Sequence, residues 1–209
     1  MKTILCYGDS NTWGHHAPLG DRFDEATRWG SRLRTILGEE YRVIEEGQRG
    51  RTTVWDDPVE NRMAGLRYLW PCLDSHAPID LVVIMLGTND CKPYFGLHPQ
   101  NIADGAGRLV DMIQKCSFGP NDTAPKVLLI SPIRIEPSSF YPHLFGEKEA
   151  AKSHGFPAAY QAVAERYGCA WLDASLLAQP DPADGVHLDA EGHKALAEAV
   201  AEKVKEIIG

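Results

Sequence analysis

The stretch that indicates the fold is DLVVIMLGTND, residues 80–90. Its first part, residues 80–86, is apolar after the leading aspartate, and a turn glycine follows directly. A strand covered by helices on both faces has this composition, because neither face needs polar side chains. Residues 126–131, KVLLIS, repeat the pattern. We therefore expect a parallel sheet with these two strands near its centre.

Apolar runs and amphipathic stretches alternate along the rest of the chain. Strands are expected at residues 3–7, 41–45, 80–86, 126–131 and 169–172, and helices near 26–38, 58–76, 100–117, 148–167 and 189–207. Alternation of this kind is typical of βαβ units, in which consecutive strands run parallel. The sequence predicts an α/β fold with a five-stranded parallel sheet.

The last expected helix has the clearest pattern, and the segment 134–157 has the weakest. Asp189 stands where an N-cap is expected, and Leu196, Val200 and Val204 form one apolar stripe behind it. Prolines and glycines interrupt residues 134–157. We expect a long loop there, with a helix that begins inside it or after it.

The composition is that of an ordinary globular protein. The chain has 209 residues, 44% hydrophobic and 24% charged, and this length fits one domain, residues 1–209. No apolar run approaches the roughly 18 residues that a membrane helix needs, so a membrane is not an expected partner. Acidic residues outnumber basic ones by 29 to 21, without a Lys/Arg block, so a nucleic acid is not expected either.

The cysteines and the N-terminus indicate a cytoplasmic protein. The five cysteines are scattered without a CxxC pair, which is typical neither of a disulfide framework nor of a zinc site. Residues 2–7 run straight into GDS at 8–10, whereas a secretory signal needs a longer apolar stretch and a cleavage site. We expect reduced thiols and no targeting segment.

Four polar motifs stand where strands of the predicted sheet end. They are GDSNTWG at residues 8–14, EGQRGRTT at 46–53, GTND at 87–90 and DGVHLD at 184–189. Ligands of parallel α/β sheets bind beyond the carboxyl ends of the strands. Residues from all four motifs are therefore expected at one site.

Three of these residues have the chemistry of a nucleophile, its base and an orienting carboxylate. A serine hydroxyl needs a neighbouring base to take its proton, and histidine is the usual base near neutral pH. Ser10 and His187 fit these two roles. Asp184 lies three residues before His187, where its carboxylate can hold the imidazole in one tautomer.

The motifs also supply hydrogen-bond donors for an oxyanion. Preorganised N–H groups stabilise the tetrahedral intermediate of acyl transfer. We expect these donors to be the backbone N–H groups of Ser10 and Gly50 and the side-chain amide of Asn89. Glycine lets a substrate approach the main chain closely, and a carboxamide donates at every working pH.

With Ser10, Gly50, Asn89 and His187 in these motifs, the sequence resembles the SGNH (GDSL-like) hydrolase family. The resemblance implies a flavodoxin-like fold of three α/β/α layers over most of the chain. Asn11 departs from the family motif, which has leucine there, and we expect this to alter local packing rather than the mechanism. The motifs look most like those of the small intracellular arylesterases and acyltransferases, so a homo-oligomer is the expected assembly.

Residues beside the proposed nucleophile and oxyanion donors have other expected roles. Asp9 and Asp90 are expected to fix backbone N–H groups around the site rather than to react. Trp13 either lines the substrate pocket or belongs to the core.

The charged neighbours of these motifs are expected outside the site. Arg49 and Arg51 flank Gly50, and we expect them at the surface, solvated or in salt bridges. His15 and His16 are expected in a loop, because no third metal ligand has a suitable spacing.

These features predict a hydrolase of small carboxylic esters that needs neither a metal nor another cofactor. An acyl-enzyme on Ser10 would be resolved by water or by an alcohol. Acetylated carbohydrates, aryl esters and thioesters all remain open as substrates. If Trp13, Phe140, Tyr141 and Phe145 wall the site, the pocket should be narrow and apolar.

Three alternatives compete with this interpretation. An α/β-hydrolase of the usual type is disfavoured because the chain has no Gly-x-Ser-x-Gly elbow. A metal-dependent phosphoesterase would use Asp9, Asp90, Asp184 and His187 as ligands, but it would leave Ser10 without a role. The third alternative is a signalling or binding domain without catalytic activity.

Overall fold

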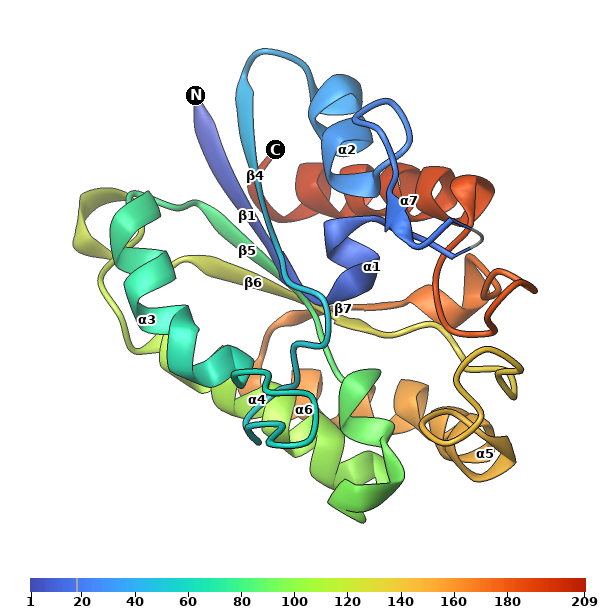
Figure 1. Cartoon of the computed structure of the whole chain (residues 1–209). Coiled ribbons are helices and arrows are strands. Elements are labelled where there is room, and N and C mark those ends of the chain that lie inside the picture. The colour runs from blue at the N-terminus through green and yellow to red at the C-terminus, as the bar shows by residue number, and fades with distance from the viewer. Residues whose placement is uncertain (18) are drawn as a thin grey trace.

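The computed structural model describes residues 1–17 and 19–209 and contains a five-stranded sheet between two layers of helices (Figure 1). Its strands are β1 (Lys2–Gly8), β4 (Tyr41–Gly47), β5 (Leu81–Met85), β6 (Lys126–Ser131) and β7 (Ala170–Asp173). Every pairing in this sheet is parallel, and the order is β4-β1-β5-β6-β7. This is the flavodoxin-like order, so the predicted α/β fold with a five-stranded parallel sheet is confirmed.

Helices cover both faces of the sheet. One face carries α2 (Trp29–Leu37) and α7 (Ala190–Ile208), and the other carries α3 (Gly65–His76), α4 (Pro99–Gln114) and α6 (Phe156–Tyr167) (Figure 1). Successive residues of a strand point to opposite faces. Val82 and Ile84 therefore pack in the core with α3, α4 and α6, while Leu81 and Val83 pack in the core with α2 and α7. Both faces of β5 are buried, which explains its unbroken apolar run.

Short elements complete the described part of the chain. They are α1 (Ser10–Trp13), α5 (Glu147–Ser153), the antiparallel pair of β2 (His15–His16) with β3 (Asp21–Arg22), and 3-10 turns at Asn89–Cys91, Pro93–Phe95, Pro120–Asp122 and Ala174–Leu176. Among these residues, no helix combines the length and the apolar character needed to cross a membrane.

The helix expected over residues 58–76 is shorter in the structure. It begins at Gly65, as α3. Ahead of it, Asp57 and Arg62 exchange two backbone hydrogen bonds of 2.8 Å, which close a turn. Because backbone groups of this segment are already bonded within the turn, the helical ladder starts only after it.

The helix expected over residues 148–167 is two helices in the structure. They are α5 and α6, and the turn residues His154 and Gly155 lie between them. Pro157 lies in the first turn of α6, where its missing N–H has no consequence. The same proline could not continue a helix from α5, because it removes a donor and its ring clashes with the preceding turn.

The last helix, α7, and the irregular segment 134–157 agree with their predictions. The Asp189 carboxylate accepts the backbone N–H of Gly192 at 2.7 Å, as an N-cap does. Leu196, Val200 and Val204 are buried in the core beneath α7. In the segment 134–157 the backbone is irregular until α5 begins.

His193 on α7 is a fully buried titratable group at the contact of α7 with α2. Its Nδ1 accepts the backbone N–H of Trp29 at 3.3 Å. Burial lowers the pKa of His193 from 6.5 to about 3, because the charged imidazolium loses its hydration, and positive charge on neighbours such as Arg32 adds to the effect.

We predict that His193 makes the fold sensitive to acid. The unfolded chain protonates this histidine below pH 6.5, while the folded chain keeps it neutral down to about pH 3, so stability that is complete above pH 6.5 is lost as the pH falls. Between these two pKa values, the free energy of unfolding falls by up to about 1.4 kcal/mol for each pH unit. In His193→Asn, the amide oxygen can accept the same N–H without titrating.

Urea denaturation of wild type and His193→Asn at several pH values tests this. As the pH falls below 6.5, the free energy of unfolding of the variant minus that of wild type should increase, with a slope that approaches the value above. Other titrating groups are common to both proteins and cancel in the difference. A stability difference that does not change with pH would contradict the prediction.

Candidate functional site

The four sequence motifs meet at the carboxyl end of the sheet. Ser10 begins α1 directly after β1, and Gly50 and Asn89 follow the ends of β4 and β5. Asp184 and His187 lie in the loop between β7 and α7. Since all five strands run parallel, their carboxyl ends share one edge, and side chains from distant parts of the sequence reach one place.

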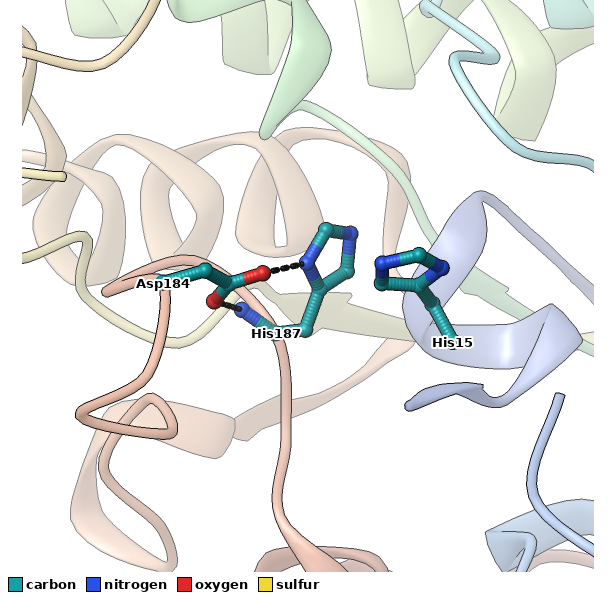
Figure 2. A group of neighbouring side chains, drawn as sticks. All are labelled: His15, Asp184 and His187. Atoms are coloured by element: carbon teal, nitrogen blue, oxygen red, sulfur yellow. Dashed lines mark hydrogen bonds and ion pairs between the residues drawn. The ribbon is translucent and has the colours of Figure 1, made fainter. Parts of the chain in front are cut away.

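Ser10, His187 and Asp184 form a hydrogen-bonded chain. Oγ of Ser10 lies 2.9 Å from Nε2 of His187. Nδ1 of His187 lies 2.5 Å from Oδ2 of Asp184, and Figure 2 shows this second contact. The other Asp184 oxygen accepts the backbone N–H groups of Val186 and His187, at 2.9 and 3.0 Å. All three side chains are buried. The structure thus brings together the residues predicted as nucleophile, base and orienting carboxylate.

These hydrogen bonds fix the charge of Asp184 and the tautomer of His187. Burial by itself raises the pKa of the Asp184 carboxyl, but the hydrogen bonds and charge of His187 outweigh burial and hold that pKa below its usual value. The ionised carboxylate accepts Nδ1–H, which leaves Nε2 as the acceptor for the Ser10 hydroxyl. The arrangement can therefore take a proton from Ser10.

Asn11 ties the serine to the histidine loop, which the sequence analysis did not predict. Its Oδ1 accepts the backbone N–H of Leu188 at 2.8 Å, and its Nδ2 donates to the backbone oxygen of Val186 at 3.5 Å. Asn11 thus holds the residues on both sides of His187. The leucine of the family motif can make neither hydrogen bond, so asparagine changes the local contacts here. The expectation that the mechanism is unaltered stays a prediction.

The three predicted oxyanion donors lie together on a cavity of about 200 Å³, which Ser10, Gly50 and Asn89 line. Gly50 has a φ of +77°, a conformation that other residues rarely adopt. The Asn89 amide donates one hydrogen to the backbone oxygen of Arg51 at 3.2 Å. That bond holds Nδ2 in place and leaves its second hydrogen for a ligand.

Arg51 is buried, so the expected surface role is wrong for this residue. It is only 2% exposed, and its guanidinium donates to the carbonyl oxygens of Gly8, at 2.9 Å, and of Glu46. The guanidinium also lies 4.2 Å from the centre of the Tyr7 ring. Arg51 therefore joins the ends of β1 and β4 and fixes the backbone that leads to Ser10.

Asp9 and Asp90 accept backbone N–H groups, in agreement with the sequence analysis. Asp9 accepts the N–H of Asn11 at 2.9 Å, and Asp90 accepts the backbone N–H and the hydroxyl of Thr53 at 3.0 and 2.6 Å. Burial raises the pKa of each carboxyl to about 6, and these hydrogen bonds limit the increase. Both residues shape the loops that carry the donors.

His15 belongs to the site, although it was expected in a loop. It lies in β2, and its buried ring faces that of His187 with 4.2 Å between the ring centres (Figure 2). Burial lowers the pKa of His15 to about 4, and the positive charge of His187 adds to the effect. His15 is therefore neutral near pH 7 and packs against His187 without competing for its proton.

The ligand set of the metal-dependent alternative is not assembled within residues 1–17 and 19–209. By distance, the described side chains that could hold a metal are His15 with Asp184 and His187, and Glu46 with Cys72 and His76. Asp9 and Asp90 belong to neither group. Their carboxylates accept hydrogen bonds from backbone N–H groups instead. The geometry therefore favours a role for Ser10.

The cavity at Ser10 has an apolar part and a charged part. Tyr141, Leu144, Phe145 and Val186 form the apolar part, and the Tyr141 ring centre lies 6.5 Å from that of His187. The charged part consists of Arg49, Glu60, Arg62 and Lys92.

The prediction of a wholly apolar pocket is therefore wrong. Tyr141 and Phe145 line the cavity as expected, but Trp13 and Phe140 do not. Trp13 packs against Arg49, whose guanidinium lies 4.6 Å from its ring centre, and Phe140 is 65% exposed. Arg49 is exposed, as predicted, but it also borders the cavity.

Comparisons with known proteins agree with this geometry. Residues 6–195 match the model of the GDSL-like Lipase/Acylhydrolase family. The aryl esterase of M. smegmatis is 39% identical, with 100% of both chains covered and a TM-score of 0.92. A carbohydrate acetylesterase from Sinorhizobium meliloti is 37% identical, with 100% of both chains covered and a TM-score of 0.93.

A longer curated relative shares the same region. An acetylxylan esterase of Xylanibacter ruminicola is 28% identical over 220 aligned positions. The alignment covers 97% of this chain but 43% of that enzyme, so the chain spans less than half of its length.

We predict that a fluorophosphonate labels Ser10 and that the rate of labelling depends on Asn11. In Asn11→Ala the loop that carries His187 loses its bridge to α1, and displacement of a reacting group by about 1 Å can lower a rate roughly a hundredfold. We expect labelling, followed by mass spectrometry, to slow about ten- to a hundredfold.

Gln161→Ala is the matched control, because Gln161 is an exposed carboxamide on α6 that bonds only to Glu165 among the described side chains. This variant should be labelled at the wild-type rate. Equal rates for Asn11→Ala and wild type would show that the bridge does not position His187.

Proposed function

Because the chain belongs to the GDSL-like lipase/acylhydrolase family, we propose that it is a serine esterase that hydrolyses small carboxylic esters through an acyl-enzyme on Ser10. The observation that carries this proposal is the hydrogen-bonded chain from Ser10 through His187 to Asp184 at the edge of a cavity. Relatives named as an aryl esterase and a carbohydrate acetylesterase support esters as the substrate class.

In the proposed mechanism, Nε2 of His187 takes the hydroxyl proton as Oγ of Ser10 attacks the ester carbonyl. The ionised Asp184 stabilises the imidazolium that forms. His187 then gives the proton to the leaving alcohol as the C–O bond breaks, and the acyl group stays on Ser10. Water, deprotonated by the same nitrogen, then attacks the acyl-enzyme. His187 returns this proton to Oγ of Ser10 as the acyl–Oγ bond breaks, and the acid is released.

The oxyanion of each tetrahedral intermediate is assigned to the backbone N–H groups of Ser10 and Gly50 and to the amide of Asn89. These donors are held before the substrate arrives, Gly50 by its turn and Asn89 by its bond to Arg51. Preorganised donors of this kind contribute roughly a hundred- to a thousandfold each to the rate.

We predict that Ser10→Ala and His187→Ala each remove nearly all hydrolysis of p-nitrophenyl acetate, and that the double variant is hardly slower. The two residues act in one proton transfer, so the loss of either disables the same step. Measurement of kcat for all four proteins tests this. Ser139→Ala and His154→Ala change exposed residues of the same types and should keep full activity. Losses that multiply in the double variant would contradict a shared mechanism.

We also propose that the acyl-enzyme transfers short acyl groups to added alcohols as well as to water. The apolar part of the cavity beside His187 favours an alcohol with an apolar body over water, because burial of that body is favourable. Assayed with vinyl acetate and dilute benzyl alcohol, the enzyme should form benzyl acetate and free acetate in a ratio above the alcohol-to-water ratio.

Tyr141→Ala should lower this product ratio, because Tyr141 lines the cavity. Phe140→Ala is the matched control, because Phe140 is exposed and does not line it. A wild-type ratio no higher than the alcohol-to-water ratio would refute the transfer activity. Equal effects of the two variants would remove the apolar part of the cavity from the explanation.

We further propose that the protein works in the cytoplasm as a homo-oligomer. Its five cysteines are all unpaired, which suits a reducing compartment. Large apolar side chains such as Val59, Met63 and Trp70 are exposed, and self-association would bury them. Cell fractionation tests the compartment, and a light-scattering mass of one chain, 23.1 kDa, would contradict the assembly.

A further inference from the structure

Two arginines of the cavity have no carboxylate partner among the described residues. Arg49 and Arg62 are exposed and line the same cavity as Ser10, and neither lies within 4.0 Å of a carboxylate oxygen. Outside the cavity, six arginines pair with carboxylates, namely Arg22, Arg28, Arg34, Arg67, Arg108 and Arg166. The other described arginines without such a pair, Arg32, Arg42, Arg51 and Arg134, do not line the cavity. The guanidinium groups of Arg49 and Arg62 are therefore free to bind a ligand.

Both side chains lie beside the proposed oxyanion donors. Arg62 passes over Gly50 so closely that a Cβ added to Gly50 would lie 2.9 Å from its Cγ and 3.1 Å from its Nε. Arg49 precedes Gly50 in the chain, and its guanidinium rests on the Trp13 ring at 4.6 Å. A guanidinium that stacks on a ring keeps its N–H groups, which lie in its plane, for another partner.

The remaining charges of the cavity are already paired. Glu60 is the one carboxylate among the described lining residues, and it contacts Lys92 at 2.5 Å. Lys92 is 1% exposed and also contacts Asp57, at 2.9 Å. Asp57 and Glu60 together carry one negative charge more than Lys92 offsets. Arg49 and Arg62 add two positive charges, so this group of five side chains has an excess of one positive charge. The whole chain, by contrast, has a formal net charge of -8.

We propose that Arg49 and Arg62 bind a carboxylate on the alcohol moiety of the substrate, so that the preferred substrates are short-chain acyl esters of anionic alcohols. Planar guanidinium groups match a carboxylate in geometry and charge. The apolar body of that alcohol then lies against the apolar part of the cavity, at Tyr141 and Phe145, where the alcohol of the transfer reaction is also proposed to bind. This inference rests on the proposed esterase function and names its substrate class.

The test compares 4-acetoxybenzoate with its methyl ester, two acetates whose phenols differ in one negative charge. Each kcat/KM is divided by the rate of hydrolysis by hydroxide, which corrects for the different leaving groups. We expect the corrected ratio of anionic to neutral ester to exceed about ten in wild type, through a lower KM, and to fall at higher ionic strength.

Substitution of the arginines gives the second readout. Arg49→Gln and Arg62→Gln should each lower the corrected ratio about three- to tenfold. Arg62→Lys should lower it less than Arg62→Gln, because the charge remains although the planar guanidinium is lost. Arg67→Gln is the matched control, since Arg67 pairs with Asp56 and does not line the cavity. The ratio compares two esters on the same protein, so a general loss of active enzyme does not affect it.

Each unexpected result has a distinct meaning. A corrected ratio near one in wild type, or a ratio unchanged in both glutamine variants, would overturn the inference while leaving the esterase function intact. A preference for 4-nitrophenyl hemisuccinate over 4-nitrophenyl butyrate, without one for 4-acetoxybenzoate, would place the anion on the acyl side and overturn the assignment to the alcohol. Failure to hydrolyse any of these esters would contradict the proposed function itself, and this inference with it.

Discussion

The site depends on a contact between two loops that are far apart in the sequence. Ser10 and His187 are separated by 177 residues, and β5 and β6 lie between the strands that precede them. The loop after β7 must therefore cross the edge of the sheet to reach α1. The hydrogen bond from Leu188 to Asn11 and the bridge between Pro180 and Leu188 hold this crossing in place. Without it, the proposed base would have no proton to accept.

Around this contact the protein buries polar groups that work against folding. Asp9 and Asp90 have pKa values raised to about 6 by burial, so their ionised forms are costly at neutral pH. The N–H groups of Asn11 and Thr53 and the charge of Arg51 offset part of that cost. The same hydrogen bonds make the site rigid, because they fix the loops that carry Ser10 and the proposed oxyanion donors before a substrate binds.

The sheet and the meeting of Ser10, Asp184 and His187 could be predicted from the sequence because both leave local signals. The apolar run at 126–131 coincides with β6, since a strand buried on both faces cannot carry polar residues without partners. Ser10, Asp184 and His187 were recognisable because each stands in a short polar motif beyond the end of a strand. Their residue types limit the chemistry, and the flavodoxin-like strand order brings the motifs together.

The residues that sequence analysis missed act through tertiary contacts, which leave no local signal. Arg51 and His15 resemble surface residues in sequence, and only the packed structure shows that both are buried beside Ser10. Arg62 lies in a turn that was expected to be helical, and its contact with Gly50 requires that turn. The four motifs therefore carry the proposed reacting groups, whereas Glu60, Arg62 and Tyr141, which line the cavity beside them, come from connecting loops. Substrate preference has to be read from those loops, whose charges the motifs do not reveal.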